Sequence, residues 1–387
     1  MADEDSDASS DIASDCTPSH LDSSISEAGD YEHSHKLYGP LVWRGDIATK
    51  EYMITLARGE LEEIRNAVMH FKVLMKKELL EKEDPLGLQY NRINRNTFPL
   101  SPDLEAKLTG ASIKLHEQNG FVVIRGIGDK TYNAEESVIA FTGISHIRDA
   151  SWEPVPKSAE GIGLAASKLP EALKFHADRF SGDVIALYFY DAGNMPGKGQ
   201  HSLASFWTIY NKLLEDAPEV IKTLEKVDWP WEVKDPEGNS HVERGPALYR
   251  RPDGKPMLQL VYNALEGSTT IPRSPEIPVL NEEQKRALEV LEGTARRVCM
   301  NLEHKTGDIQ LVHNLSVMHA RSSYKSQQKH NSRHLLRLFL RDPERCWAKP
   351  KEYAHLFNEP FQTGLSQSFP IIDDDPWRKT SGSFSHG

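Results

Sequence analysis

The sequence predicts an α+β fold built around a mostly antiparallel sheet. Residues that favour strands are concentrated in Leu173–Tyr190 and Asp308–His319, which are rich in β-branched and aromatic side chains. A third segment, His334–Arg341, has the apolar content of a buried strand. Because segments with helical spacing also occur, the pattern is typical of an α+β domain.

The earlier part of the chain supplies two expected helices and one expected strand. Apolar residues recur at intervals of three and four within Glu60–Lys77, which predicts an amphipathic helix with one face on the core. A helix is also expected at Ser101–Gln118. The apolar run Gly120–Gly126 that follows lies between glycines and predicts a buried strand. Later, Asn281–Leu302 has helical spacing, and Asn281 is the expected N-cap.

The first 36 residues differ from the rest in composition. They contain ten acidic residues and one basic residue, Lys36, with few large apolar side chains. Such a segment cannot bury enough apolar surface to offset the entropy lost on ordering, so residues 1–36 are expected to be a disordered acidic tail. We find no internal repeat or linker in residues 37–387, which we therefore expect to form a single domain.

Charge and hydropathy limit the partners. The formal net charge is -11, but outside the acidic tail 45 basic residues nearly balance 47 acidic ones. No basic stripe is available for a phosphate backbone, so nucleic acid is not an expected partner. No apolar run reaches the roughly 20 residues of a membrane helix. The N-terminus has neither the basic start nor the apolar run of a secretory signal, which favours a cytoplasmic protein.

A histidine and an acidic residue two positions apart occur three times in the sequence, at His20, His176 and His241. The first pair lies in the acidic tail, and the pair His241 and Glu243 lies in a polar segment interpreted as a loop. His176 and Asp178 adjoin strand-like sequence, where a spacing of two directs both side chains to one face. They can then share a metal ion, although a third ligand is needed and a surface histidine is the simpler alternative.

A second segment makes the pattern specific. It begins with Gly307-Asp308, continues through apolar residues to Asn314, and reaches His319 and Arg321. Together with the earlier pair, it resembles the TauD/TfdA-like family of iron(II)- and 2-oxoglutarate-dependent dioxygenases. The resemblance extends over about Phe98–Asp342. It implies a double-stranded β-helix core (jelly-roll, clavaminate synthase-like) with flanking helices, and it implies Fe(II), 2-oxoglutarate and O2 as the reactive partners.

The same resemblance assigns roles to individual residues. It implies that His176, Asp178 and His319 are the iron ligands, with the nearby His313 left out as a histidine inside a strand. In the family an arginine about fourteen positions after the distal histidine binds the far carboxylate of 2-oxoglutarate, and this position is Arg333 here. A guanidinium suits a carboxylate because it donates two parallel hydrogen bonds and stays charged when enclosed.

Arg337 and Ser202 complete the expected site. Arg337 lies four residues after Arg333 and would face the same side of a strand, where it would hold an anionic group of the substrate or the iron-proximal end of 2-oxoglutarate. Ser202 stands where the family has a hydroxyl that assists the co-substrate, but the run from Gly199 lacks the second glycine of that pattern. Ser202 can equally be the N-cap of the helix that follows.

The expected function is oxidation of a small organic molecule, by hydroxylation or by desaturation or cyclisation. The substrate is expected to be amino-acid derived, because Arg337 suggests an anionic group, or an intermediate of secondary metabolism, because the sequence looks more like fungal members of the family. The oligomeric state is left open. A serine hydrolase with Ser202 as nucleophile is disfavoured, since Gln200 and Ala204 replace the glycines of a nucleophile elbow. The alternative is a non-catalytic jelly-roll binding protein.

Overall fold

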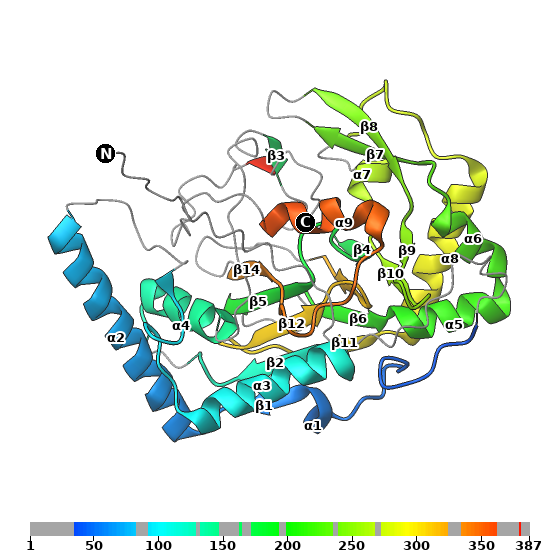
Figure 1. Cartoon of the computed structure of the whole chain (residues 1–387). Helices are drawn as coiled ribbons and strands as arrows, with labels where there is room; N and C mark the ends of the chain where they lie inside the picture. The colour runs from blue at the N-terminus through cyan, green and yellow to red at the C-terminus, as the bar shows by residue number, and fades with distance from the viewer. Residues whose placement is uncertain are drawn as a thin grey trace, which may run out of the picture.

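The structure is a computed structural model that describes residues 35–82, 92–128, 132–146, 162–164, 172–192, 199–234, 239–267, 272–323, 334–361 and 379–380. Its centre is a pair of β-sheets with helices on their outer faces (Figure 1). The predicted α+β class is confirmed. The predicted tail, residues 1–36, falls almost entirely outside the described residues, so its disorder stays a prediction.

The larger sheet has five strands in the order β1-β2-β12-β5-β14. Its strands are β1 (Met53–Thr55), β2 (Phe121–Arg125), β5 (Val184–Asp191), β12 (Ile309–His313) and β14 (His334–Leu340). All pairings except β1 with β2 are antiparallel. The helices α2 (Arg58–Lys82), α3 (Pro102–Glu117) and α4 (Ala134–His146) cover its outer face through a shared apolar cluster.

The smaller sheet has four antiparallel strands in the order β11-β6-β13-β4. Its strands are β4 (Leu173–His176), β6 (His201–Ser205), β11 (Met300–Leu302) and β13 (Val317–Arg321). The helices α5 (Phe206–Asp216), α6 (Pro218–Glu225) and α8 (Glu282–Val298) pack on its outer face. The predicted cap of α8 is confirmed, because Asn281 and Gln284 form a reciprocal capping box.

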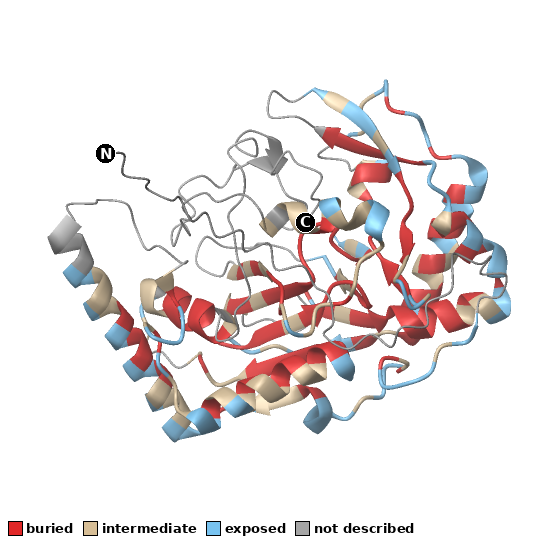
Figure 2. Ribbon diagram, viewed as in Figure 1, coloured by how far each residue is buried: buried red, intermediate tan, exposed pale blue. Residues whose placement is uncertain are grey.

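Apolar residues between the two sheets join them face to face. Val123 and Val312 of the larger sheet share a buried cluster with Leu203, Val317 and Met300 of the smaller sheet. Figure 2 shows both sheets largely buried, with most of the exposure on the outer helices, the connecting segments and strand β8 (Ser240–Gly245). The space between the sheets is therefore the interior in which a functional site is most shielded from water.

The remaining elements are short and lie outside the two sheets. They are α1 (Thr49–Tyr52), β3 (Ile162–Leu164), the hairpin of β7 (Trp229–Lys234) and β8 (Ser240–Gly245), β9 (Leu248–Arg250), β10 (Pro256–Leu258), α7 (Asn263–Glu266), α9 (Ala354–Asn358) and β15 (Lys379–Thr380), with 3-10 turns at Lys351–Tyr353 and Glu359–Phe361. Within the described part of the chain, no helix combines the length and apolarity needed to cross a bilayer.

Two expectations from the sequence are wrong in detail. The helix expected at Asn281–Leu302 ends at Val298, and Met300–Leu302 form strand β11, because the apolar residues there pair with β6. His241 and Glu243 lie on strand β8, and not in a loop. This strand is polar because it forms a two-stranded hairpin beyond the main sheets, and its Glu243 forms an ion pair with the buried Arg179.

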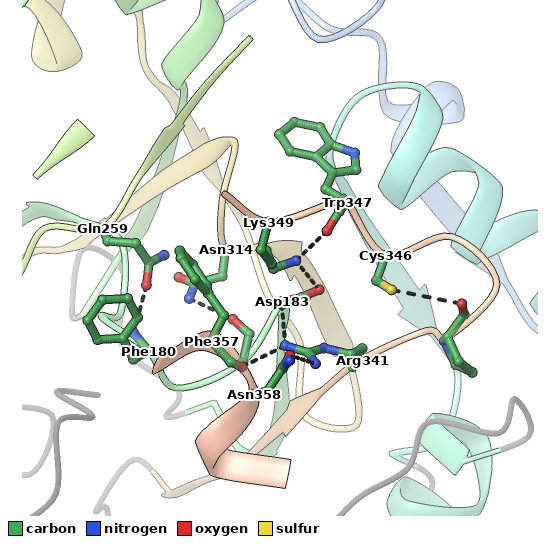
Figure 3. Close-up of polar contacts among 12 residues, drawn as sticks. Phe180, Asp183, Gln259, Asn314, Arg341, Cys346, Trp347, Lys349, Phe357 and Asn358 are labelled. Carbon is green, nitrogen blue, oxygen red and sulfur yellow. Dashed lines mark hydrogen bonds and ion pairs between the residues drawn. The ribbon is translucent and has the colours of Figure 1, made fainter. Parts of the chain in front are cut away.

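A buried ion cluster closes one end of the sheet pair. Asp183, just before β5, lies 2.7 Å from Nζ of Lys349 and 3.4 Å from Nη2 of Arg341, which follows β14 (Figure 3). Arg341 also donates to the backbone oxygen of Phe357 and to Asn358, so the cluster fastens the C-terminal helix α9. Burial lowers the pKa of Lys349 to about 8, while the two cations keep the pKa of Asp183 well below its usual range although burial alone would raise it.

Removing the carboxylate of this cluster should destabilise the protein strongly. Asp183→Asn leaves two buried cations without a counter-ion, and we expect a loss of about 3–5 kcal/mol in the free energy of unfolding, measured by urea denaturation. Lys349→Met should cost less, because Arg341 still neutralises Asp183. The control is Lys285→Met at an exposed ion pair, expected to change stability by less than about 1 kcal/mol. Equal effects of Asp183→Asn and Lys285→Met would contradict this role.

Candidate metal centre

Strand pairing brings His176 and His319 side by side. Strands β4 and β13 are antiparallel neighbours, and His319 lies directly opposite His176 in their register. The two imidazole centroids are 4.1 Å apart. Phe175 and Met318, the residues that precede them, pack in the apolar cluster beneath the outer helices, so both histidines face the interior between the sheets. Two nitrogen donors distant in sequence therefore meet in one place.

Asp178 adds a carboxylate to the same place. Its Oδ1 lies 3.6 Å from Nε2 of His176 and 4.0 Å from Nε2 of His319, and its side chain is buried. One ligand atom from each residue lies within 4.8 Å of the others, and this is the metal-ligand group found among the described residues. The three residues expected to bind iron are thus brought together.

The turn that follows Asp178 is fixed by two buried amides. Asn314 accepts a hydrogen bond from the backbone nitrogen of Asp178 at 2.8 Å and donates to the backbone oxygens of Asp178 and Gly182. Phe180 has a left-handed backbone with φ of 52°, and its nitrogen donates to Gln259 at 2.6 Å (Figure 3). A left-handed non-glycine residue is unfavourable unless its surroundings enforce it, so these amides hold the Asp178 carboxylate in position.

The two histidines present suitable nitrogens to a metal. Nδ1 of His176 donates to the backbone oxygen of Lys174 at 2.8 Å, which leaves Nε2, 3.6 Å from Oδ1 of Asp178, as the nitrogen available to a metal. Burial, together with the nearby His176 and Arg337, lowers the pKa of His319 well below its usual value. His319 is therefore neutral near pH 7, which is the form that binds a metal.

The predicted arginines differ in what the structure says of them. Arg337 lies on β14 with its Nη1 3.4 Å from Oδ2 of Asp178, and its guanidinium stacks over Phe339. Its neighbours Leu336 and Leu338 belong to the outer cluster, so Arg337 faces the interior as expected. Arg333 lies outside the described residues, and its role stays a prediction.

The structure does not bring Ser202 to the metal ligands. Ser202 lies opposite Ala320 in the pairing of β6 with β13, whereas Leu203 lies opposite His319. Its side chain consequently points to the outer face of the sheet, where its hydroxyl donates to Asn301. The alternative role as a helix cap is also wrong, because Ser205 caps α5 by accepting from Thr208. The sequence motif located the strand but not the direction of its side chains.

His313, which was left out of the expected ligand set, lies apart from the three clustered residues. It is fully buried, its Nδ1 lies 2.8 Å from Oγ of Ser316, and its ring packs between His116 and Trp347. The supporting amides of Asn314 and Gln259 were not identified as functional from the sequence. Asn314 had a signal, since it stands at a matching motif position, but nothing in the sequence distinguishes Gln259.

The donor set fits ferrous iron. Two neutral imidazoles and one carboxylate on one side of an ion are the ligands of non-haem iron(II) oxygenases, and they leave adjacent positions for other molecules. The fixed tautomer of His176, the neutral His319 and the clamped turn of Asp178 show that these residues are arranged before any ion binds. Arg337 beside the carboxylate adds a cation where an anionic molecule can bind next to the metal.

Comparison with known proteins identifies a family of dioxygenases. Residues 84–339 match the family described as taurine catabolism dioxygenase TauD, TfdA family. The taurine hydroxylase-like protein SAT17 of Stachybotrys chartarum is 31% identical over 363 residues, which cover 88% of this chain and 89% of that protein. FR-33289 synthase of Streptomyces rubellomurinus is 26% identical over 291 residues, covering 69% and 82% of the two chains.

Solved structures show a related fold. Asparagine oxygenase, in a complex with Fe(II), 2S,3S-3-hydroxyasparagine and succinate, superposes with a TM-score of 0.50 at 14% identity over 74% of this chain and 93% of that one. Another structure of asparagine oxygenase gives a TM-score of 0.50 at 13% identity over 76% and 93%. Since the family match spans most of the chain and the relative from Stachybotrys chartarum covers nearly all of it, this protein belongs to the TauD, TfdA family of dioxygenases.

Proposed function

We propose that this protein is a non-haem dioxygenase that depends on Fe(II) and 2-oxoglutarate, with His176, Asp178 and His319 as the iron ligands. The observation that carries the proposal is the convergence of these three side chains, within 4.8 Å of one another, from strands distant in the sequence. The two facing sheets are, in this proposal, the double-stranded β-helix of such enzymes. The family match supports the same assignment.

Each part of the site then has a task. When bound, iron and 2-oxoglutarate supply the oxidising power to insert one oxygen atom of O2 into a C–H bond, while the other enters the succinate formed as CO2 is released. The chain holds the coordinating atoms, excludes water between two apolar sheets and aims the substrate. We assign the far carboxylate of 2-oxoglutarate to Arg333, and an anionic group next to the metal to Arg337, whose guanidinium lies 3.4 Å from Oδ2 of Asp178.

The substrate is proposed to be a small molecule that is amino-acid derived or an intermediate of secondary metabolism. Arg337 supports an anionic substrate, because its guanidinium faces the interior at the metal ligands. The names of the relatives, a taurine hydroxylase-like protein and a synthase, are consistent with small-molecule chemistry. Hydroxylation is the proposed outcome. Desaturation or cyclisation requires the same site and a substrate whose geometry disfavours transfer of the hydroxyl group.

The decisive test is turnover. The full-length protein, loaded anaerobically with Fe(II), should release succinate from 2-oxoglutarate in the presence of O2, and one class of metabolite in a screen of amino acids, their derivatives and anionic metabolites should raise the rate. Omitting iron should abolish the release. A protein that binds a metabolite but neither consumes O2 nor forms succinate under any of these conditions is the non-catalytic binding protein, and this result would refute the proposal.

The ligand assignment is tested by two neighbouring histidines. His319→Ala removes one of three donors, so the dissociation constant for Fe(II), or for Co(II) as an air-stable probe, should rise by at least about 100-fold. His313→Ala should leave metal stoichiometry and affinity unchanged, because His313 contacts Ser316 and no ligand. Circular dichroism of both variants checks that they fold. The reverse pattern would show that His313, and not His319, is the ligand.

The two arginines should separate by what they bind. Arg333→Met is expected to weaken the binding of 2-oxoglutarate by about 2–3 kcal/mol, which raises its dissociation constant roughly 30- to 150-fold. Arg337→Met should weaken the binding of the anionic molecule next to the metal. It should not weaken the binding of Co(II), since it removes a positive charge beside Asp178. Titration of the protein with Co(II), and of the Co(II)-loaded protein with 2-oxoglutarate or the anionic molecule, measures these affinities. If 2-oxoglutarate binds Arg333→Met as tightly as the parent, its far carboxylate is held elsewhere.

A further inference from the structure

Gln310 is a buried polar residue on the central strand of the larger sheet. Its neighbours Ile309 and Leu311 pack in the outer cluster, whereas Val312 lies in the cluster between the sheets. Because side chains alternate along a strand, Gln310 faces the interior together with Val312. It is fully buried, so its carboxamide lies inside the sandwich and not at its rim.

Gln310 lies at the same level as the metal ligands. In the larger sheet it stands beside Leu187, which stands beside Arg337, the residue that contacts Asp178. Two positions further along, Phe189 of this sheet contacts the ring of His201, which pairs with Arg321 in the smaller sheet. The next interior row of the larger sheet contains Leu187 and Gln310, and the next interior row of the smaller sheet contains Leu203 and His319. These two rows therefore lie at the same level of the sandwich.

Neither polar atom of the Gln310 carboxamide has a hydrogen-bond partner among the residues that the structure describes. Buried amides are almost always satisfied, because an unpaired one has lost its hydrogen bonds to water without replacement. If the amide had no further role, an apolar residue at this position would make the protein more stable. The carboxamide therefore indicates a hydrogen-bond partner that is present only when the site is occupied.

His319 has the matching deficiency on the facing sheet. Its Nε2 is directed at Asp178, so Nδ1 is its outer nitrogen, and Nδ1 is buried without a partner. His176 differs, because its Nδ1 donates to the backbone oxygen of Lys174. A histidine that binds a metal through Nε2 carries its proton on Nδ1, and that N–H nearly always donates to an acceptor that fixes the ring. His319 thus needs an acceptor that the backbone does not supply.

We propose that Gln310 is the outer-sphere partner of His319: when a metal occupies the site, Nδ1–H of His319 donates to one buried water, and this water donates to Oε1 of Gln310. This inference rests on the proposed function, since it requires the three ligands to hold an ion. Gln310 is then a positioning residue, which orients the His319 ring from the opposite sheet and couples metal binding to the contact between the two sheets.

The test is the variant Gln310→Met, which keeps the length and shape of the side chain and removes both polar atoms. Metal-free Gln310→Met should unfold at the same temperature as the parent or higher, because two unsatisfied atoms are gone. Its dissociation constant for Co(II), measured by titration of the full chain, should nevertheless rise by roughly 10- to 100-fold. A residue with a purely structural role would not raise stability and weaken the metal together.

Two further variants control the result. Gln310→Glu keeps an acceptor oxygen and should bind Co(II) at least as tightly as the parent. Leu203→Met alters packing in the row of His319 without touching a hydrogen bond, and it should leave Co(II) affinity within about twofold. The visible spectrum of bound Co(II), which reports ligand geometry, should change in Gln310→Met and stay that of the parent in Leu203→Met.

Three outcomes would overturn the inference. Unchanged Co(II) affinity in Gln310→Met with weaker 2-oxoglutarate binding would assign the carboxamide to the co-substrate. Loss of stability in the metal-free variant would mean that the amide is satisfied by the protein itself. If Gln310→Glu binds Co(II) as weakly as Gln310→Met does, the acceptor role is excluded. If the parent binds no Co(II), or His319→Ala does not weaken it, the proposed function fails instead.

Discussion

The pairing of β4 with β13 is the constraint on which the site depends. It sets His319 opposite His176, and a shift of one residue would turn one of the two imidazoles to the outer face of the sheet. The register is held because Phe175 and Met318 bury their side chains beneath the helices while Leu203 and Val317 bury theirs between the sheets. The apolar cores on the two faces of this sheet therefore also specify the metal ligands.

The three residues proposed as iron ligands could be named from the sequence because they lie in short motifs. Asp178 follows His176 by two residues beside strand-like sequence, and His319 was assigned from the motif that resembles the TauD/TfdA-like family. The main strands and the helices at Glu60–Lys77 and Ser101–Gln118 were predictable for the same reason, since alternation and helical periodicity are properties of short windows. Asn314 was found as a motif position, while its role in clamping Asp178 depends on a contact across the fold.

The sequence-based predictions that failed depended on which face of a strand a side chain occupies, or on a contact with a residue distant in the sequence. The motif placed Ser202 on the correct strand, but its face follows from the pairing of Leu203 with His319, which no local pattern encodes. Glu243 lies in polar sequence and was assigned to a loop, yet it forms a strand and neutralises the buried Arg179. Gln310 sits in an apolar run, and the role proposed for it rests on its burial with no hydrogen-bond partner among the described residues.

The two carboxylates of one turn show how the structure separates support from chemistry. Asp183 is enclosed by Lys349 and Arg341, so its charge is fully used in fastening the C-terminal segment to the sheets. Asp178 has one cation, Arg337, on Oδ2, and its Oδ1 faces the imidazoles of His176 and His319. Because the rigid turn between them is anchored at Asp183, Asp178 can present an incompletely compensated charge without moving. A divalent cation at this site would neutralise that residual charge.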